Sequence, residues 1–417
     1  MPVPLFPASA AWSDAGRLSV GGVDLHDLAS EFGTPAYVFD VAEFRNRAAQ
    51  LVDGLTARWP NSQVLFASKA LPTVATYALA AHCGLGIDVS GQGEIVMALA
   101  AGVDPKLLYF HGNAKTTEEL TFAVRSGVGT IVIDNADELD RLLAIPAPGQ
   151  HVLIRVIPGV APETHPSQST GGSDSKFGVP YDQAHAMTEK IRSSEMVFDG
   201  VHLHIGSQIL HAAPFGEAVR QLAEFPGCAV YDVGGGLGVP YTYAEQPPSI
   251  DAYLDAIVTA ARDTLPADAK LIIEPGRSLV AIAGLTLYTV VSVKRTGRTF
   301  VAVDGGMADN LDPALTQQRY EAVIAQDRPD APLVQCDLVG RQCESGDKLI
   351  GDLELAGPQI GDLVAMPVTG AYAYTLANNY NGARKAPVVF VEDGTTQLVV
   401  RRETYDDLLS TQLGWRP

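Results

Sequence analysis

Polar residues with catalytic potential end a series of short apolar segments between residues 64 and 276. A lysine whose pKa is lowered by burial can form an imine, a histidine offers a flat ring, and a carboxylate can bind a protonated ring nitrogen. These residue types can support covalent catalysis only if the fold brings the ends of the segments together. Eight such residues occur, one for each segment: Lys69, Asp88, His111, Asp134, Arg155, His204, Asp232 and Glu274.

The eight segments are continuous apolar runs, which is typical of parallel strands covered on both faces. They occupy residues 64–68, 85–89, 107–112, 130–134, 151–156, 200–206, 229–235 and 270–276, with helical patterns between them. Eight alternating strands and helices predict an α/β fold, a (β/α)8 TIM-type barrel over residues 33–284. A doubly wound open sheet is the alternative, but it usually needs fewer repeats. In a barrel, catalytic groups lie at the C-terminal ends of the strands, where these polar residues fall.

The helix and strand alternation stops after Gly284. Strands are predicted at 286–295, 299–306, 333–340, 362–370 and 387–400, the last a hairpin that turns on Asp393-Gly394. Near the N-terminus, residues 17–25 read as a hairpin with a Gly-Gly turn, and Asp40 caps an amphipathic helix. Residues 1–32 and 285–417 are therefore predicted to form a second, mainly β domain, a sandwich or barrel.

Composition narrows the class of protein. The 417 residues include 29 basic and 48 acidic side chains, so the formal charge is 29 − 48 = −19, which argues against nucleic-acid and anionic-membrane partners. No segment reaches the roughly 18 apolar residues of a membrane span, and the N-terminus does not resemble a secretory signal. The four cysteines form no CxxC pair, so we expect no metal site, no disulfide framework and a cytoplasmic protein.

A glycine run follows the seventh predicted strand, at Gly234, Gly235 and Gly236. Exposed backbone N–H groups at this position of a barrel can bind a phosphate, and Arg277 can assist them. Together with an imine-forming Lys69 and a ring-binding Glu274, this loop indicates a pyridoxal 5′-phosphate (PLP) site. A carboxylate that keeps the pyridine nitrogen protonated favours decarboxylation. Taken singly, each feature also fits a tight turn, a rim lysine or a structural side chain.

The motifs, taken in order, resemble the diaminopimelate decarboxylases among the alanine-racemase-like (fold type III) PLP enzymes. The resemblance runs from about Gly22 to Leu409 and is highly specific as an ordered set. Its motifs are FASKA (66–70), DVSGQGE (88–94), HGNAK (111–115), TGGSDSKFG (170–178), HLHIGSQI (202–209), DVGGGLG (232–238), EPGRS (274–278), DGGMADN (304–310), CESGD (343–347) and GAYAYTLANNYN (370–381).

The resemblance implies a role for individual residues. Lys69 matches the imine-forming lysine, His204 the residue that stacks on the pyridine ring, and Cys343 the proton donor, and these three form the expected catalytic set. The loop that carries Cys343 and Glu344 comes from the other subunit in this family, which implies a homodimer with shared active sites. The expected cofactor-binding set is Lys69, Asp88, His204, Ser207, Gly234, Gly235, Gly236, Glu274, Gly276, Arg277 and Tyr372, and the expected substrate-binding set is Asp312, Thr316, Glu344, Arg277 and Tyr372.

One departure from the family pattern concerns the substrate. Where these enzymes carry an Arg and a Tyr that hold the distal carboxylate of meso-diaminopimelate, this chain carries Asp312 and Thr316. Losing a charge-assisted bond costs about 1.5–3 kcal/mol, and a reversed charge adds repulsion. We therefore expect a PLP-dependent α-decarboxylase acting on a related amino acid, a biosynthetic intermediate or an aminoacyl group tethered to a carrier protein.

Other functions stay open at this point. Arg319 or Arg341 could compensate for the missing arginine, and the enzyme would then be an ordinary diaminopimelate decarboxylase that makes L-lysine and CO2. An amino-acid racemase of the same fold usually places an arginine against the pyridine nitrogen, so Glu274 speaks against it. A non-catalytic PLP-binding homologue would tend to lose the lysine, the cysteine or the β domain.

Overall fold

The computed structural model describes residues 5–160, 162, 171–172 and 174–415 of the chain. Part of the motif at 170–178 lies outside these residues. Two compact units are present. The β domain comprises Met1–Arg45, Pro240–Glu245 and Val280–Pro417, and the barrel unit comprises Asn46–Val239 and Gln246–Leu279.

The barrel unit contains a closed ring of eight parallel strands. Each strand pairs with its neighbours in chain order, and the last pairs with the first, Leu271 lying opposite Ser62. The barrel prediction is confirmed for all eight strands, whose continuous apolar residues face the barrel interior on one side and helices on the other. The strands are β5 (Ser62–Ala67), β6 (Gly86–Val89), β7 (Leu108–Phe110), β8 (Thr130–Ile133), β9 (His151–Arg155), β10 (Val197–His202), β11 (Val230–Asp232) and β12 (Lys270–Ile273).

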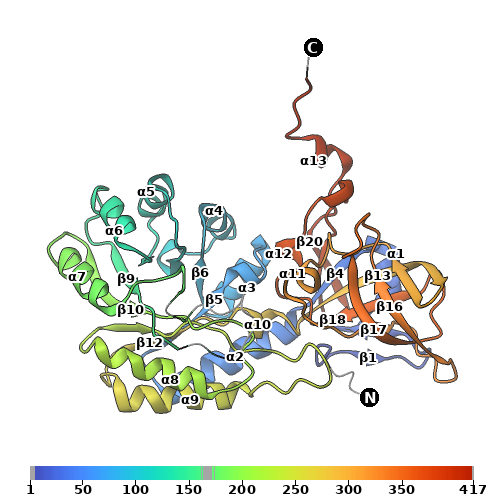
Figure 1. The fold of residues 1–417 in the computed structure, drawn as a ribbon, viewed down its shortest axis with the longest axis horizontal. Coiled ribbons are helices and arrows are strands. Elements are labelled where there is room, and N and C mark those ends of the chain that lie inside the picture. Colours follow the sequence, from blue (N-terminus) through green and yellow to red (C-terminus); the bar gives the residue numbers. More distant parts are fainter. Residues whose placement is uncertain (1–4, 161, 163–170, 173, 416–417) are drawn as a thin grey trace. The chain divides into compact units, whose positions relative to one another are not determined.

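Helices cover the outside of this ring, as Figure 1 shows for α4 to α9. Local signals fix their ends: Thr116 and Glu119 form a capping box at the start of α5, and Gly127 ends that helix in the left-handed region, with φ 76°. No helix in the described part of the chain is long and apolar enough to cross a bilayer. The helices that belong wholly or mainly to this unit are α2 (Val41–Arg58), α3 (Val74–His82), α4 (Gln92–Ala100), α5 (Thr117–Ser126), α6 (Ala136–Leu143), α7 (Tyr181–Arg192), α8 (Ala213–Gln221), α9 (Ile250–Thr264) and α10 (Arg277–Val280).

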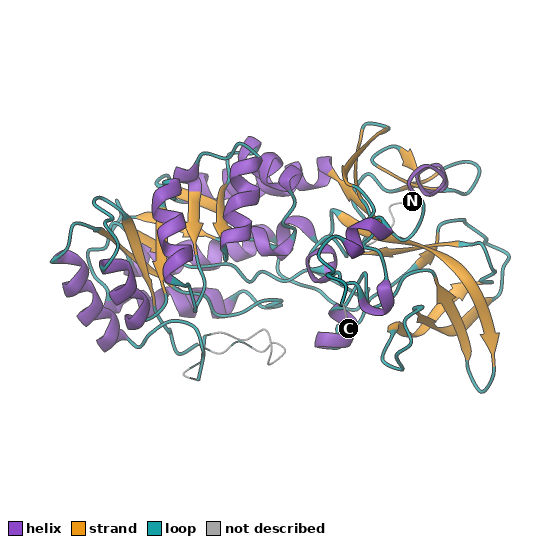
Figure 2. Cartoon of the chain, turned by 90° about the horizontal axis from the view of Figure 1, so that it is seen from above, coloured by secondary structure: helices purple, strands orange, loops and turns teal. Residues whose placement is uncertain are grey.

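The β domain is built on a nine-stranded sheet, whose long curved strands are visible in Figure 2. Its main path runs β17-β16-β14-β13-β4-β19-β20, and β15 and β18 pair at its side. A separate three-stranded sheet holds β1, β2 and β3. The strands are β1 (Ala11–Trp12), β2 (Leu18–Val20), β3 (Val23–Asp24), β4 (Ala36–Asp40), β13 (Gly284–Arg295), β14 (Thr299–Val303), β15 (Val323–Ile324), β16 (Leu333–Val339), β17 (Lys348–Ala356), β18 (Leu363–Pro367), β19 (Val388–Glu392) and β20 (Thr395–Val400), with the short helices α1 (Leu25–Phe32), α11 (Asp312–Thr316), α12 (Ala373–Leu376) and α13 (Tyr405–Leu409).

Every strand that the sequence placed in the β domain is present, including both predicted hairpins. Four strands, the two-residue β1 and β15 and the longer β4 and β17, were not predicted. The sequence assigned residues 33–284 to the barrel, but β4 pairs with β13 and β19, so the compact β domain extends through Arg45. The boundary differs because a strand joins the sheet of its hydrogen-bonding partners, which lie some 250 to 350 residues further along the chain.

A buried ion pair ties the loop between β7 and α5 to helix α6. Lys115 Nζ lies 2.9 Å from Glu138 Oε1, and both side chains are almost fully buried. The same ammonium donates to the carbonyls of Gly112 and Val132, at 2.7 and 2.8 Å. Burial lowers the pKa of Lys115 and raises that of Glu138, so each charge depends on the other for compensation.

Replacing Lys115 by methionine should therefore lower the free energy of unfolding by about 3–5 kcal/mol, because Glu138 is left buried without its counter-ion. Urea unfolding followed by circular dichroism measures the change. Lys190→Met is the matched control, since Lys190 pairs with Asp140 at 2.9 Å on the exposed surface and should cost under about 1 kcal/mol. Equal costs for the two variants would contradict the assignment.

Candidate active site

The C-terminal end of the barrel gathers the polar residues that end its strands. Lys69 lies in the single 3-10 turn η1 (Ser68–Ala70) that follows β5, and its Nζ is 3.4 Å from Asp88 Oδ2 on β6. Asp88 is buried, whereas 44% of the Lys69 side chain is exposed in the single chain. The expectation that Lys69 is buried is therefore not met here. Its amine is open to a ligand and held by a carboxylate.

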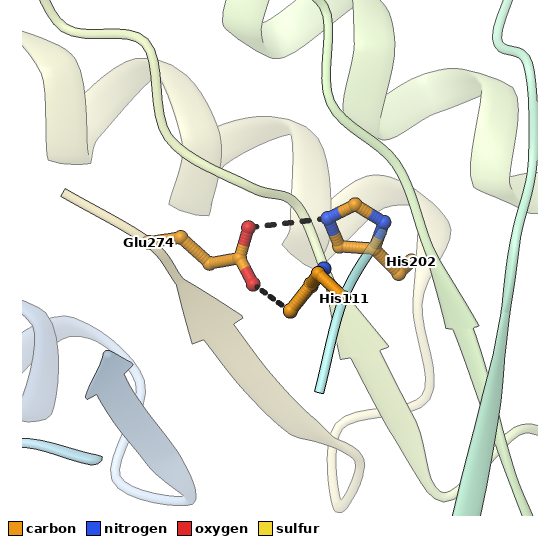
Figure 3. A group of neighbouring side chains, drawn as sticks. All are labelled: His111, His202 and Glu274. Carbon is orange, nitrogen blue, oxygen red and sulfur yellow. Dashed lines mark hydrogen bonds and ion pairs between the residues drawn. The ribbon is translucent and has the colours of Figure 1, made fainter. Parts of the chain in front are cut away.

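Glu274 is a buried carboxylate between two histidines (Figure 3). Its Oε1 lies 2.9 Å from Nε2 of His111, which follows β7, and its Oε2 is 3.1 Å from Nε2 of His202, which ends β10. The three residues come from strands on different sides of the ring and meet at its centre. The two imidazole rings themselves lie edge to face, with centroids 4.9 Å apart.

The histidines determine the charge of this carboxylate. Burial alone would raise the pKa of Glu274, but His111 and His202 together hold it well below its usual value. Burial lowers the pKa of His202 to about 4, so its ring is neutral at pH 7 and donates through Nε2. Burial and the charge of Glu274 raise the pKa of Asp232 well above its usual value. The neighbouring carboxyl groups of Glu274 and Asp232 are therefore shifted in opposite directions.

His204 lies two residues after His202, beside the glycine loop. Its Nδ1 accepts a hydrogen bond from the backbone N–H of Gly235 at 3.2 Å, so the ring proton is assigned to Nε2. Burial, with the charges of Lys69 and Arg155, lowers the pKa of His204 well below its usual value. A neutral ring with one edge fixed by the backbone can stack on an aromatic ligand.

The glycine loop packs too closely for any side chain. A Cβ at Gly235 would lie 2.0 Å from the carbonyl oxygen of Glu274, and one at Gly236 would lie 2.3 Å from that of Gly206. Gly236 also has φ 117°, which favours glycine. Arg277, which is buried, donates through Nε to Ser207 Oγ at 3.3 Å beside this loop. Gly276 packs against Ala67 at the end of β5, and a Cβ there would lie 3.0 Å from Cβ of Ala67.

These residues fit PLP. Glu274 Oε1 is buried and, apart from the His111 ring 2.9 Å away, has no aligned hydrogen bond among the described residues, so it can also accept from a ring N–H. The backbone N–H of Gly236 and the Arg277 guanidinium lie where a phosphate group could bind, and the Lys69 amine is accessible. The ligand atoms of His111, His202 and Glu274 lie within 4.8 Å of one another and could also hold a cation. Lys69 and the glycine loop favour the organic phosphate.

The remaining predicted site residues belong to the β domain, where hydrogen bonds join three loops. The Asp347 carboxylate accepts from the backbone N–H groups of Met307 and Gln342, both at 2.7 Å. Cys343 is exposed, and its N–H donates to Asn381 Oδ1 at 2.7 Å. Glu344, next to Cys343, is exposed as well, while Tyr372 is half-buried and has φ 66°.

Asp312 has hydrogen-bonding partners that the sequence did not suggest. Its carboxylate is buried and accepts hydrogen bonds from Thr316 Oγ1 at 3.0 Å and from the Tyr320 hydroxyl at 2.7 Å. Tyr320 in turn packs edge to face on Tyr241, with centroids 4.8 Å apart. These neutral donors stabilise the Asp312 carboxylate within the β domain without cancelling its charge. The role of Asp312 toward a substrate stays a prediction.

Comparison with known proteins decides the family. The model of the "Pyridoxal-dependent decarboxylase, pyridoxal binding domain" family matches residues 42–281, more than half of the chain. The chain belongs to the pyridoxal-dependent decarboxylases. This decarboxylase is 41% identical to the diaminopimelate decarboxylase of Bacillus subtilis, with 96% of each chain covered. It is 36% identical to that of Mycobacterium tuberculosis (strain H37Rv), with 98% of each covered.

Solved structures agree with this assignment. The diaminopimelate decarboxylase from M. jannaschii, in complex with L-lysine, has a TM-score of 0.91 and 31% identity to the decarboxylase over 98% of both chains. That of Helicobacter pylori, also with L-lysine, has a TM-score of 0.85 and 30% identity over 93% of this chain and 98% of that one. The predicted family, fold, PLP cofactor and decarboxylase chemistry are confirmed.

Sequence reasoning missed two partners of Glu274. His111 was noted as the end of a strand but given no role, and His202 was not singled out. The H-x-H spacing of His202 and His204 carried a signal, since residues two apart at the end of a strand project to the same side. Which histidine would reach Glu274 depends on how the barrel closes.

Replacing Lys69 by alanine should abolish covalent attachment of PLP to the decarboxylase. The visible absorbance of the lysine-linked cofactor should disappear, and the cofactor should be lost on dialysis. Lys106→Ala is the control, because Lys106 precedes β7 at the opposite end of the barrel and should leave the spectrum unchanged. A wild-type protein without this absorbance would refute the cofactor site.

His202 should make the stability of the apoprotein fall in mild acid. Its pKa is lowered from 6.5 to about 4 in the folded state, so between these values only the unfolded state takes up the proton. The free energy of unfolding should decrease by up to about 3 kcal/mol as pH falls through that window. His202→Gln, which keeps a donor for Glu274, should flatten the dependence, whereas exposed His82→Gln should not. Urea unfolding at several pH values tests this.

Proposed function

We propose that this enzyme decarboxylates meso-2,6-diaminopimelate to L-lysine and CO2. The observation that carries the proposal is its 36–41% identity to diaminopimelate decarboxylases over nearly the full length of both partners. The resemblance extends through the β domain, which supplies the expected substrate contacts, and is not confined to the cofactor-binding barrel. Two related structures contain L-lysine, the product that this reaction would give.

Different residues of the barrel bind and orient the cofactor. Bound PLP supplies an electron sink for the pair left at the α-carbon when the carboxylate departs as CO2. Lys69 anchors it through the amine, and Arg277 with the Gly236 N–H binds its phosphate. Glu274, kept ionised by two histidines, holds a proton on the ring nitrogen. His204 supports the ring face.

The β domain is proposed to complete the reaction. Cys343 is exposed on a loop whose backbone is fixed by Asn381 and Asp347, so its thiol can deliver a proton to the α-carbon of a substrate. Glu344 on the same loop would contact the substrate, and Tyr372 the phosphate. Following the family resemblance, we propose that the Cys343 loop serves the active site of a second subunit in a homodimer. Four free cysteines are consistent with a cytoplasmic enzyme.

A second candidate substrate is an amino acid without a distal carboxylate. It is favoured by one observation, the absence of an arginine at position 312. The hydrogen bonds that Thr316 and Tyr320 donate to the buried Asp312 carboxylate weaken the case, because they give this acid partners within the β domain. Carrier-bound aminoacyl substrates gain no support from the relatives.

The purified holoenzyme should release CO2 from meso-diaminopimelate with a turnover number on the order of 1–10³ per second and yield an equal amount of L-lysine. Its kcat/KM for this substrate should exceed that for L-lysine or L-ornithine by roughly 10- to 150-fold, the range expected from one charge-assisted bond to the distal carboxylate. Manometric CO2 release and chromatography of the products measure both quantities.

Lys69→Ala serves as the inactive control in that assay. Turnover of a monocarboxylic amino acid with no preference for meso-diaminopimelate would reject the proposed substrate in favour of the second candidate. Racemisation of a single enantiomer without CO2 release would reject decarboxylation altogether.

A further inference from the structure

The β domain contains a cavity lined by charged residues. It has a volume of about 230 Å³, and the residues that give it its charge are Arg341, Arg384, Arg402, Asp304 and Asp309. At roughly 30 Å³ per water molecule, it has room for seven or eight waters, enough for inorganic phosphate or a short dicarboxylate. All of its lining residues belong to one unit.

Three of the residues that line the cavity are arginines without an ion pair among the described residues. In the described part of the chain, neither Arg341, Arg384 nor Arg402 has an ion pair within 4.0 Å, although acidic residues outnumber basic ones by 19 overall. Arg402 donates to the backbone carbonyl of Pro35 at 2.8 Å, and Arg384 stacks on the ring of Tyr405 at 4.8 Å. These contacts hold the guanidinium groups of Arg402 and Arg384 in place without neutralising their charge.

The two acidic residues of the cavity balance these three positive charges only in part. Asp304 Oδ2 accepts from Thr34 Oγ1 at 2.6 Å and its Oδ1 from the Thr289 N–H at 2.9 Å, and these bonds hold the carboxylate in place. Burial raises the pKa of Asp309 to about 7, so it is only partly ionised at neutral pH. Burial and the nearby charge of Arg384 lower the pKa of Arg402, whereas the charges of Asp304 and Asp309 act in the opposite direction.

The cavity walls also belong to the segments that hold Cys343. Arg341 and Gln342 directly precede that cysteine, and the Arg341 N–H donates to the Gly305 carbonyl at 2.9 Å. On the other side, Gly382–Arg384 follow Asn381, whose side chain accepts from the Cys343 N–H. A ligand that brings the Arg341 and Arg384 side chains closer together would therefore shift both of the segments that position the Cys343 backbone.

We propose that this cavity binds a small anion bearing carboxylate or phosphate groups, and that its occupancy alters the setting of the loop that carries Cys343. Planar guanidinium groups match both anions through paired N–H donors. The residues that line it differ from those proposed to bind the PLP phosphate. Its existence does not depend on which amino acid the enzyme decarboxylates.

The test is isothermal titration calorimetry of the PLP-loaded enzyme, in which the cofactor already fills the barrel phosphate site, with inorganic phosphate and with succinate. We expect saturable binding of at least one of them, and their comparison distinguishes phosphate from carboxylate ligands. R384Q and R341Q should each weaken binding by roughly 10- to 150-fold, the loss of one charge-assisted contact. R295Q is the matched control, since Arg295 is an exposed arginine of the same domain outside the cavity.

A second measurement follows the rate at which iodoacetamide alkylates Cys343, read by mass spectrometry of its peptide. The rate should change when the anion saturates wild type and R295Q, and should not respond in R341Q. Absence of saturable binding, or equal affinity in wild type, R384Q and R341Q, would overturn the site. Binding that leaves the alkylation rate unchanged would overturn its connection to the Cys343 loop. None of these results requires turnover, so they are independent of the proposed substrate.

Discussion

The placement of a buried negative charge at the centre of the barrel mouth is the constraint on which the site depends. An isolated carboxylate in a low-dielectric interior would take up a proton, and Glu274 would then fail to hold a protonated pyridine nitrogen. His111 and His202 prevent this by presenting Nε2 to its two oxygens at 2.9 and 3.1 Å. They come from β7 and β10, which lie on different sides of a closed ring. An open sheet would not bring three such strands to one point, so the barrel topology is a requirement of the chemistry.

The sequence revealed the barrel because its strands carry their signal locally. Runs such as residues 130–134 are apolar throughout, and β8 is buried at every position. Of the four missed strands, β1 and β15 are only two residues long, and β4 and β17 escaped prediction for different reasons. β4 is a five-residue segment whose neighbours β13 and β19 follow hundreds of residues later. β17 is interrupted by Gly351 and by Asp352, which has φ 54°, where its pairing with β16 shifts register. Neither pattern is visible in a short window of sequence.

The same distinction applies to the functional residues. Lys69, the glycine loop and Glu274 were recognisable because residue type and position at a strand end suffice to suggest a role. The partners of Glu274 and of Asp312 were not, because a hydrogen bond between side chains depends on rotamers and on packing. Asp312 was interpreted from the family resemblance, as an acid that replaces an arginine. Its buried carboxylate accepts hydrogen bonds from Thr316 and Tyr320 of the same domain, and no pattern in the sequence pointed to these two donors.

An anionic cofactor must bind here to a protein with a formal charge of −19. At the barrel mouth, burial and the neighbouring charge of Glu274 raise the pKa of Asp232, which favours the uncharged form of that carboxyl group. Arg277 is buried beside the glycine loop, where its charge acts through little water and is therefore strong at short range. Bound PLP would place its ring nitrogen against Glu274 and its phosphate against Arg277 and the backbone N–H groups of the glycine loop. Overall charge thus says little about which ligand a protein binds when the groups of opposite sign are separated within the site.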